Sequence, residues 1–505
     1  MFWADEIAEK IIKSGKFKPY WVDDMKTPSG FSHVGSLMGP VIHSMIFRSL
    51  KDAGQKAIFT FVINDFDPAD DLLPEIKGTD FEEELGKPLK LAKSPDPKFK
   101  SMADMFGDDF TKAIKNLGVE ADIMSSWEIY HQGKFDEVIR EALDNAGKIQ
   151  DIYQEVSGSK KKEAGWLPFQ VICEKCQKLG TTKVYDWDGE KVSYICEQNL
   201  VTWAKGCGHR GKVSPFGGTG KLPWKVDWAA HWKVIGVTIE GAGKDHASKG
   251  GSYDIAMTIC KDVFKYDQPF KLPYEFVLIG GKKMSSSKGL GIKAHDLVRI
   301  LPSEVGRFLF ARNGIKSQTN FDPEGTNAIP VLFDDYQKAA AEYFKKEKTD
   351  LARAFELSQF DEIRKPPKVR FSVLAQWVQM PNMKDSIKKE GLEDWAKYAR
   401  VWVEKYAPEK ERFQIQENLQ EQIKLSKEQK LYLKSLEADF SKKMDPEQIQ
   451  LLIYNKAKEQ GISSKEAFAA VYSIFLGKDH GPKAGWLLAN LNREFIVERL
   501  NEASA

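Results

Sequence analysis

The N-terminal part of the chain has the hydrophobic pattern of one βαβ unit. Apolar residues recur at helical spacing from Ile7 to a terminal Gly15. Residues 20–22 predict a short strand, and a turn rich in Pro, Gly and Ser follows at 27–36. Residues 37–50 then have the pattern of an amphipathic helix, and 57–63 are almost continuously apolar, as in a buried strand. This order predicts two parallel strands joined by a crossover helix.

Beyond this unit, helical and extended patterns alternate. Residues 64–100 are polar with scattered Pro and Gly, so we expect a long loop of functional importance. Helical spacing returns at 104–117 and 135–153. Further strands are predicted at 232–240, before a Gly-Ala-Gly turn and a helix, and at 276–281, before a loop of lysines and serines.

The strand signal disappears after about Phe333. Segments rich in Glu, Lys, Leu and Ala, such as 351–360 and 447–460, predict helices there. We therefore expect an α/β domain at 1–325, with an inserted segment at 155–222, and a separate all-helical domain at 326–505.

Composition and charge are those of a soluble chain with several domains. The 505 residues are 42% hydrophobic, and 75 Lys and Arg nearly balance 73 Asp and Glu, so the overall charge does not indicate a nucleic-acid partner. No apolar run is long enough to span a bilayer. The start of the chain is mixed and soon acidic, unlike a signal peptide. We expect a cytoplasmic protein without a membrane partner.

Four of the five cysteines lie close together in the sequence, at Cys173, Cys176, Cys196 and Cys207. In a long cytosolic chain such a cluster favours a metal over disulfides, and a C-x-x-C pair with two later ligands is common around zinc. Since the last two cysteines are far apart, His209 is an alternative to one of them. Buried inert cysteines are the competing interpretation, and a redox pair is less favoured. We expect a structural Zn²⁺.

Two loops that follow strands carry residues suited to phosphate. Residues 28–36 form a glycine turn before a helix, where backbone N–H groups bind phosphate well and His33 can donate to a phosphate oxygen. Residues 282–289 interleave three lysines with three serines, which suits a polyanion. Taken singly, each loop is also compatible with an ordinary surface turn.

Together, the two loops resemble the "HIGH" and "KMSKS" motifs of class I aminoacyl-tRNA synthetases. The first is Pro-Ser-Gly-Phe-Ser-His-Val-Gly-Ser, with Ser36 in place of the final histidine. The second is Lys-Lys-Met-Ser-Ser-Ser-Lys, with Ser286 in place of the second lysine. That loss puts weight on Lys282, Lys283 and Lys288 as substitutes.

Other stretches resemble the class I lysyl-tRNA synthetase family within this class. They are Leu85-Gly-Lys-Pro-Leu, Ser94-Pro-Asp-Pro, Leu222-Pro-Trp-Lys-Val-Asp-Trp, Gly477-Lys-Asp-His-Gly-Pro and, most specifically, Gly243-Lys-Asp-His-Ala-Ser. The resemblance covers nearly the whole chain. It implies an α/β fold: a Rossmann-like class I synthetase catalytic domain with a zinc-ribbon-like insertion, followed by an all-α C-terminal domain that binds the anticodon.

The resemblance also implies a reaction and its residues. L-lysine is activated by ATP with Mg²⁺ to lysyl-adenylate, and the lysyl group is then transferred to the 3′ end of tRNA(Lys); a monomer is expected. The implied catalytic residues are His33, Lys283 and Lys288. ATP would contact Pro28, Gly30, His33, Gly35, Ser36, Gly243, Asp245, His246, Met284, Ser285, Ser286, Ser287 and Lys288. The amino acid would contact Asp23, Asp24, Thr27, Trp224, His246 and Tyr274.

Two alternatives stay open. One is a class I synthetase for another amino acid, such as glutamate. The other is a non-catalytic tRNA-binding paralogue, because Ser36, Ser286 and Met25 depart from the pattern of the family. Met25 stands where the family usually has a small residue.

Overall fold

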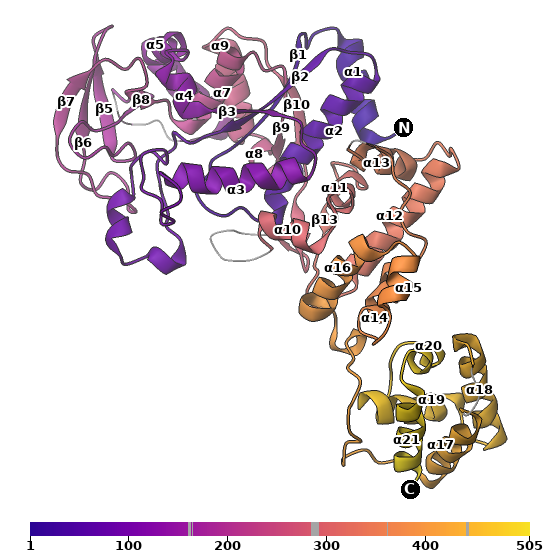
Figure 1. The fold of residues 1–505 in the computed structure, drawn as a ribbon. Coiled ribbons are helices and arrows are strands. Elements are labelled where there is room, and N and C mark those ends of the chain that lie inside the picture. Colours follow the sequence, from indigo (N-terminus) through magenta and orange to yellow (C-terminus); the bar gives the residue numbers. More distant parts are fainter. Residues whose placement is uncertain (160–162, 164, 284–291, 361, 441–443) are drawn as a thin grey trace. The chain divides into compact units, whose positions relative to one another are not determined.

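The computed structural model describes the chain except for residues 160–162, 164, 284–291, 361 and 441–443 (Figure 1). Contacts between residues divide it into two units. The first contains residues 1–321 and 341–363, and the second contains 322–340 and 364–505. The domain limits expected from the sequence, 1–325 with 155–222 inserted and 326–505, stay a prediction.

The first unit is built on a five-stranded sheet in the order β10-β9-β1-β2-β3 (Figure 1). Neighbouring strands are parallel throughout. Since β2 and β3 extend from one side of β1 while β9 and β10 extend from the other, the strand order reverses between β1 and β9. Open parallel sheets bind ligands at the carboxyl ends of the strands that flank such a reversal. The strands are β1 (Tyr20–Lys26), β2 (Ala57–Ile63), β3 (Asp122–Ser125), β9 (Ile239–Gly243) and β10 (Phe270–Tyr274).

The βαβ unit predicted from the N-terminal sequence is confirmed. β1 and β2 run in parallel register from Tyr20 opposite Ala57 to Lys26 opposite Ile63. A short helix η1 (Val34–Leu37) leads into the connecting helix α2 (Met38–Asp52), which is buried along most of its length. Helix α1 (Trp3–Ser14) packs against α2 and ends at Gly15, where a φ of 66° allows the left-handed turn.

The segment 64–100, described in full, is irregular as predicted. Its only helices are the 3-10 turns η2 (Pro74–Ile76) and η3 (Asp80–Glu84). Ala69 and Leu89 nevertheless pack with Phe106 of the next helix, α3 (Met102–Asn116), into a small core. The segment is therefore a packed structure at the end of β2.

One predicted strand is wrong. Of residues 232–240, the first four end helix α7 (Trp224–Ile235), 236–238 form a turn, and only the last two enter β9. Since α7 is buried on several sides, it carries no single apolar stripe, and its apolar run has the pattern of a buried strand. The helix predicted at 135–153 is two helices, α5 (Asp136–Asp144) and α6 (Ala146–Ser157), which Asn145 separates.

Two smaller sheets lie between the first and second halves of the main sheet in sequence. β4 (Gln170–Val171) pairs with β8 (Gly220–Lys221), and β5 (Thr182–Trp187), β6 (Val192–Cys196) and β7 (Arg210–Val213) form an antiparallel sheet. Cys173, Val184 and Tyr194 of this region share one core with Trp228 and Trp232 of α7. The inserted segment is thus packed on the first unit.

The remaining elements of the first unit surround the main sheet. The predicted strand at 276–281 is β11 (Val277–Ile279), which pairs with β12 (Lys282–Lys283) and β13 (Thr319–Asn320) in a separate sheet. The helices are α4 (Ser126–His131), α8 (Lys244–Ala247), α9 (Ser252–Asp262), α10 (Ala294–Ile300), α11 (Ser303–Ala311) and α13 (Asp350–Ser358).

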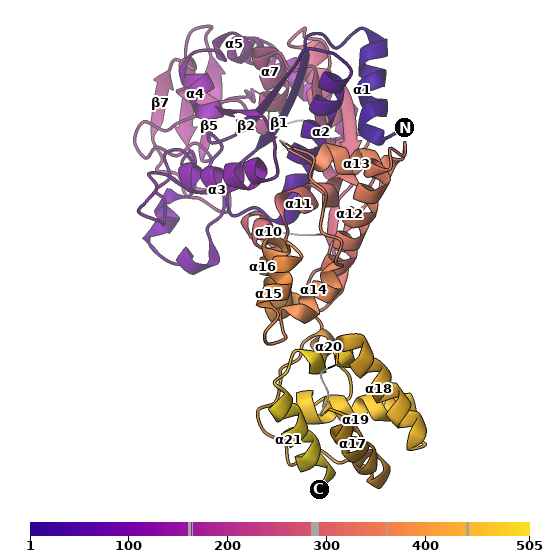
Figure 2. The same cartoon turned by 45° about the vertical axis from the view of Figure 1, so that its right-hand side comes forward.

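The second unit is helical, with no strand among its described residues. Helix α12 (Ala328–Phe344) begins in this unit and ends in the first. The later helices are α14 (Phe371–Trp377), α15 (Lys384–Lys389), α16 (Glu393–Val401), α17 (Lys427–Asp439), α18 (Pro446–Glu459), α19 (Ser464–Leu476), α20 (Ala484–Ala489) and α21 (Arg493–Ser504). Helices α17 to α21 gather around one apolar core (Figure 2). The prediction of a helical C-terminal part is confirmed.

Candidate functional site

A cavity of about 560 Å³ opens at the carboxyl ends of β1 and β9, where the strand order of the sheet reverses. Its walls come from these strand ends, the segment after β2, the start of α7 and the inserted segment. Its lining residues are Asp24, Met25, Lys26, Thr27, Ser29, Asn64, Asp67, Pro68, Asp70, Gln170, Trp203, Leu222, Pro223, Trp224, Asp227, Trp228, Glu240, Gly241, Ala242, Gly243, His246 and Tyr274.

One end of the cavity is acidic. Asp24 and Glu240 line it, and Asp23 lies fully buried beside them. The buried Oδ2 atoms of Asp23 and Asp24 accept no hydrogen bond from the described residues. Burial raises the pKa of Glu240 to about 8, and burial together with Glu240 raises the pKa of Asp23 well above its ordinary value. Incompletely paired buried carboxyl groups at a cavity wall favour a cationic ligand.

The backbone of α2 packs tightly against this acidic end. A Cβ on Gly39 would lie 2.7 Å from both Asp24 Oδ2 and the Tyr274 hydroxyl, so only glycine leaves room for this pair. His43, one turn later, donates from Nδ1 to the Gly39 carbonyl at 2.7 Å and accepts the Gly241 N–H on Nε2 at 2.7 Å. This fixes the tautomer of His43 and joins α2 to the end of β9.

Aromatic rings form another wall. Trp224 stacks on Trp228 with ring centroids 6.0 Å apart, and the His246 ring lies 5.5 Å from that of Trp224. The indole N–H of Trp228 donates to Glu240 at 2.8 Å, and that of Trp232 donates to the same carboxylate. Indole faces with a carboxyl group behind them suit an apolar stem that ends in a cation.

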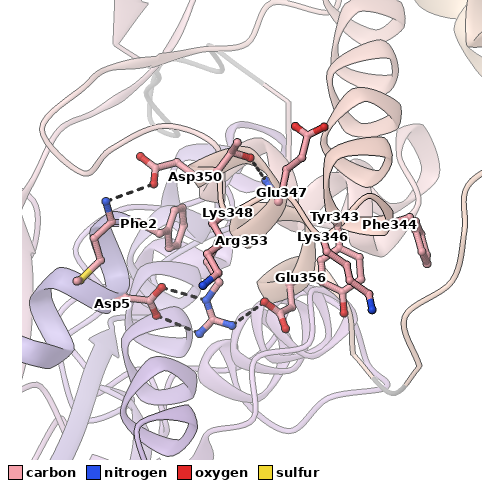
Figure 3. A pocket seen from close by; sticks show the side chains of 13 residues that line it. Phe2, Asp5, Tyr343, Phe344, Lys346, Glu347, Lys348, Asp350, Arg353 and Glu356 are labelled. Atoms are coloured by element: carbon pink, nitrogen blue, oxygen red, sulfur yellow. Dashed lines mark hydrogen bonds and ion pairs between the residues drawn. The ribbon is translucent and has the colours of Figure 1, made fainter.

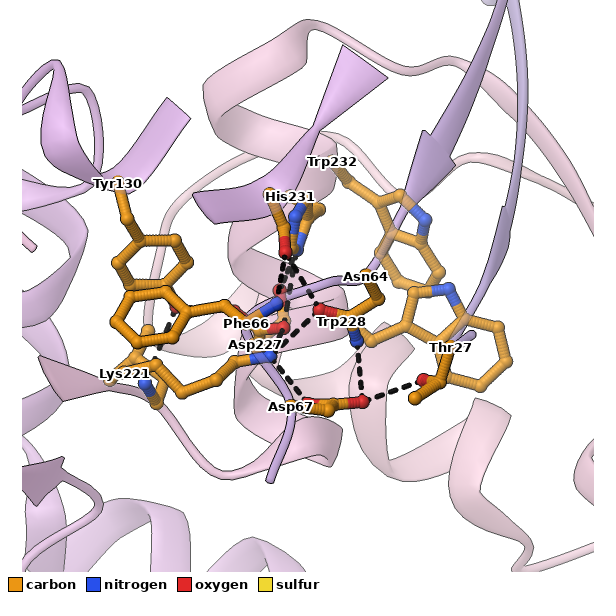
Figure 4. A network of polar contacts seen from close by, with 12 residues as sticks. Thr27, Asn64, Phe66, Asp67, Tyr130, Lys221, Asp227, Trp228, His231 and Trp232 are labelled. Carbon is orange, nitrogen blue, oxygen red and sulfur yellow. Dashed lines mark hydrogen bonds and ion pairs between the residues drawn. The ribbon is translucent and has the colours of Figure 1, made fainter. Parts of the chain in front are cut away.

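The opposite end of the cavity carries a network of polar contacts (Figure 4). The Thr27 hydroxyl donates to Asp67 Oδ2 at 2.6 Å. Lys221, which is 1% exposed, contacts Asp67 at 2.7 Å, Asn64 at 2.9 Å and Asp227 at 2.9 Å. The carboxylates at this end are thus already paired with a cation that belongs to the protein.

The glycine turn 28–36 lies outside the cavity lining except for Ser29. His33 forms an antiparallel bridge with Lys293, and the Ser36 N–H donates to the His33 carbonyl at the start of η1. A Cβ on Gly35 would lie 2.9 Å from the His33 ring, so glycine is needed there. The turn leads into the N-terminal end of η1, which continues into α2. A helix N-terminus is a favourable place for phosphate.

The lysine and serine loop is described only at its start. Lys282 is exposed on β12, and Lys283 follows it on the same strand. Met284, Ser285, Ser286, Ser287 and Lys288 lie outside the described residues.

The structure brings only part of the predicted set together. Asp24, Thr27, Trp224, Gly243, His246 and Tyr274 line the cavity, whereas Asp23, Pro28, Gly30, His33, Gly35, Ser36 and Asp245 do not. Glu240, Asp67, Asp227 and Trp203 were missed, although a charged residue at the end of an apolar run, as at Glu240, is a usable sequence signal.

The four clustered cysteines meet in the inserted segment. Their sulfur atoms all lie within 4.8 Å of one another, with Cys173 and Cys207 3.6 Å apart and Cys176 and Cys196 also 3.6 Å apart. Four thiolates around a tetrahedral zinc at about 2.3 Å have nearly this spacing, so these residues fit the ion. His209 is not part of this group of four.

A separate cavity of about 540 Å³ lies between the start of α1 and α13 (Figure 3). Arg353 lines this cavity, and its guanidinium contacts Asp5 at 3.0 Å, Asp52 at 2.6 Å and Glu356 at 2.9 Å. No predicted site residue lines it. Of the carboxylates that line this cavity, Asp5 and Glu356 pair with Arg353, Asp350 with the N-terminal ammonium and Glu347 with Lys345.

Comparison with known proteins identifies the family of this chain. The family model described as tRNA synthetases class I (K) matches residues 1–361, so the chain belongs to this family. Among its relatives, the lysine–tRNA ligase of Archaeoglobus fulgidus is 32% identical over 520 residues, with all of both chains covered. That of Methanococcus maripaludis is 34% identical over 545 residues, with 99% of both chains covered.

A solved glutamate–tRNA synthetase from Elizabethkingia anophelis is 12% identical, with a TM-score of 0.48 over 96% of this chain and 99% of that one. This likeness is too weak to identify a substrate. None of the described helices combines the length and the apolar composition needed to cross a membrane.

Proposed function

We propose that this protein is a lysine–tRNA ligase. It activates L-lysine with ATP and transfers the lysyl group to tRNA(Lys). The observation that carries the proposal is the cavity between β1 and β9, which combines aromatic walls with the carboxyl groups of Asp24 and Glu240. This chemistry suits an ammonium on an aliphatic stem. Membership in a family whose compared members are lysine–tRNA ligases supports it independently.

The first step joins the amino acid to AMP. The lysine carboxylate attacks the α-phosphorus of ATP and diphosphate leaves, so the barrier falls mainly through positioning and stabilisation of negative charge. His33 and the backbone at the start of α2 are proposed to hold phosphate, together with Lys283 and Lys288. Gly243, which has a backbone open to close approach, and Asp245 are proposed to meet the nucleoside. Mg²⁺ bound with ATP supplies further positive charge.

The second step transfers the lysyl group to the terminal ribose of tRNA, and AMP leaves. A neighbouring cavity of about 730 Å³ shares Gln170, Pro223 and Trp224 with the first. Exposed Tyr185 and the side chain of Lys183 also line it. Aromatic faces beside lysines suit a single-stranded nucleic-acid end, and we propose that the 3′ end of tRNA enters here.

The helical second unit is proposed to bind the anticodon, and the four clustered cysteines to hold a structural Zn²⁺. The protein is expected to act in the cytoplasm as a monomer.

Glutamate is disfavoured as the substrate amino acid. A side-chain carboxylate placed near Asp24 would meet like charge in a buried site. A non-catalytic paralogue would bind tRNA without activating an amino acid.

Amino-acid-dependent exchange of diphosphate into ATP, measured both with and without tRNA(Lys), tests the proposal. We expect exchange with lysine, and a rise of at least tenfold in the lysine KM for Asp24→Asn, because the substituted side chain keeps its shape and loses its charge. The ATP KM of this variant should stay within about twofold of the wild type. Exchange driven by another amino acid, or no exchange at all, would contradict the proposal.

A further inference from the structure

The buried ammonium of Lys221 lies directly behind the amino-acid cavity. Lys221 is the last residue of β8, at the end of the inserted segment, and pairs across the ladder with Gln170 of β4. Its side chain is 1% exposed and does not line the cavity. A lysine in such a place must be paired to remain charged.

Its pairing is complete. Nζ lies 2.7 Å from Asp67 Oδ1, 2.9 Å from Asn64 Oδ1 and 2.9 Å from Asp227 Oδ2 (Figure 4). An ammonium has three N–H donors, so these acceptors use all of them. Burial lowers the pKa of Lys221, but Asp227 and Asp67 raise it by more, so its pKa lies above the ordinary value.

Asp67 connects this ammonium to the cavity wall. While Oδ1 contacts Lys221, Oδ2 accepts the Thr27 hydroxyl at 2.6 Å and the Asn64 amide at 2.8 Å. A carboxylate can only accept hydrogen bonds, so the proton of the Thr27 hydroxyl points to Asp67. Thr27 itself lines the cavity. Its oxygen therefore presents only lone pairs to a ligand.

We infer that Lys221 is a positioning residue that, through Asp67, holds the Thr27 hydroxyl as an obligatory acceptor for the α-ammonium of the amino-acid substrate, at the end of the cavity away from Asp24 and Glu240. This inference rests on the proposed function, because it needs an amino acid in this cavity. Lys221 acts by keeping Asp67 in the form that accepts from Thr27.

If Lys221 acts through Thr27, the effects of substituting these two residues on lysine binding are not independent. A double-mutant cycle measures this coupling. The variants are Thr27→Val, Lys221→Met and the combination, assayed by diphosphate exchange. Each single variant is expected to raise the lysine KM about tenfold, the order of a hydrogen bond to a charged group, with an unchanged ATP KM. In the Thr27→Val background, Lys221→Met should raise the lysine KM by less than about twofold more.

Arg307 provides a matched control for the loss of a buried cation. It is also fully buried, donates to the carbonyls of Leu117 and Leu357 and to the Ser44 hydroxyl, and is not among the residues that line the cavity. Arg307→Met should lower the melting temperature and leave both KM values unchanged. If Lys221→Met does not fold, Asp67→Asn replaces it in the cycle, because an amide at 67 can donate to Thr27 and reverse this hydrogen bond.

Independent effects of the two substitutions, which multiply in the double variant, would overturn the inference. So would a rise in the ATP KM equal to that in the lysine KM, which would mark a general structural role. The proposed function fails separately, if the wild-type enzyme activates a different amino acid. The cycle would then be measured with that amino acid and would still test Lys221.

Discussion

At the scale of single residues, the cavity has two ends of opposite electrostatic state. At one end Lys221 pairs with Asp67 and Asp227, whereas at the other Asp24 keeps a buried oxygen without a hydrogen bond from the described residues. An added cation therefore gains more from the Asp24 end, where Asp24 Oδ2 is paired with the His43 imidazole at 3.4 Å rather than with a lysine. The two ends of the cavity therefore differ in their affinity for a cation, although both are rich in carboxyl groups.

The raised pKa of Glu240 predicts a pH dependence of lysine binding. With a pKa of about 8, Glu240 is mostly protonated at pH 7. A bound ammonium favours the carboxylate, so binding lowers this pKa and releases a proton. Because binding that releases protons strengthens as pH rises, the Kd for lysine should fall from pH 6 to pH 8. Titration calorimetry in two buffers of different ionisation enthalpy measures the released proton directly.

Glu240→Gln is the control for this prediction, since glutamine cannot titrate. It should remove most of the proton release and flatten the pH profile. An unchanged profile in this variant would assign the titration to another group.

Residue-level predictability from the sequence was uneven. The apolar run that ends at Glu240 carried a local signal, since a carboxylate at the end of a buried segment is unusual. Lys221 carried none: a lysine between glycine and leucine looks like a surface residue. Its burial depends on Asp67, distant in sequence, and on Asp227, which lies in the first turn of the next helix, α7. The hydrophobic pattern of the sequence around Lys221 does not reveal these two ion pairs.

At the scale of elements, the order of strands places the site. β1 and β2 were predicted because their apolar runs are short and bounded by turn residues. α7 was missed because residues 226–232 are buried in succession, on all sides of the helix, so the run shows no helical periodicity. β10 was missed because Lys271 and Pro273 interrupt its apolar residues.

The cysteine group couples the inserted segment to the cavity wall. The N–H groups of Leu179 and Gly180, just after the C-x-x-C pair, donate to the Gly86 carbonyl at 2.6 and 3.0 Å. Gly86 belongs to the segment that follows β2, which also carries Asp67. The folded inserted segment therefore helps to hold in place the part of the cavity wall that contains Asp67 and Pro68.

We therefore predict that Cys176→Ser removes bound zinc and weakens amino-acid activation. Structural zinc contributes about 10–16 kcal/mol of apparent folding free energy to small modules, so its loss should open residues 155–222 to proteolysis. Metal content measured by mass spectrometry should fall from one zinc per chain to none.

Cys260→Ser is the matched variant, because Cys260 is buried on α9 outside the cysteine group. It should retain the metal. Wild-type protein without zinc, or a Cys176→Ser variant that retains it, would contradict the assignment.

At the scale of the whole molecule, the chain joins an α/β unit that carries the cavity to a helical unit with its own core. The helical class of the C-terminal part was predictable because its Glu-, Lys- and Leu-rich segments keep one period over long stretches. The grouping of residues 341–363 with the first unit was not, because α13 packs on α11 through contacts that no local pattern encodes.

The measurement that tests the account most directly is aminoacylation of total tRNA by the full-length protein, with ATP and Mg²⁺ and each of the twenty amino acids in turn. The account predicts that lysine is charged, and that it is the amino acid favoured over all others, because the cavity offers carboxyl groups and aromatic walls to an ammonium. Preferential charging with another amino acid would contradict the assignment of this cavity to lysine. No charging, with tRNA binding intact, would contradict catalysis itself.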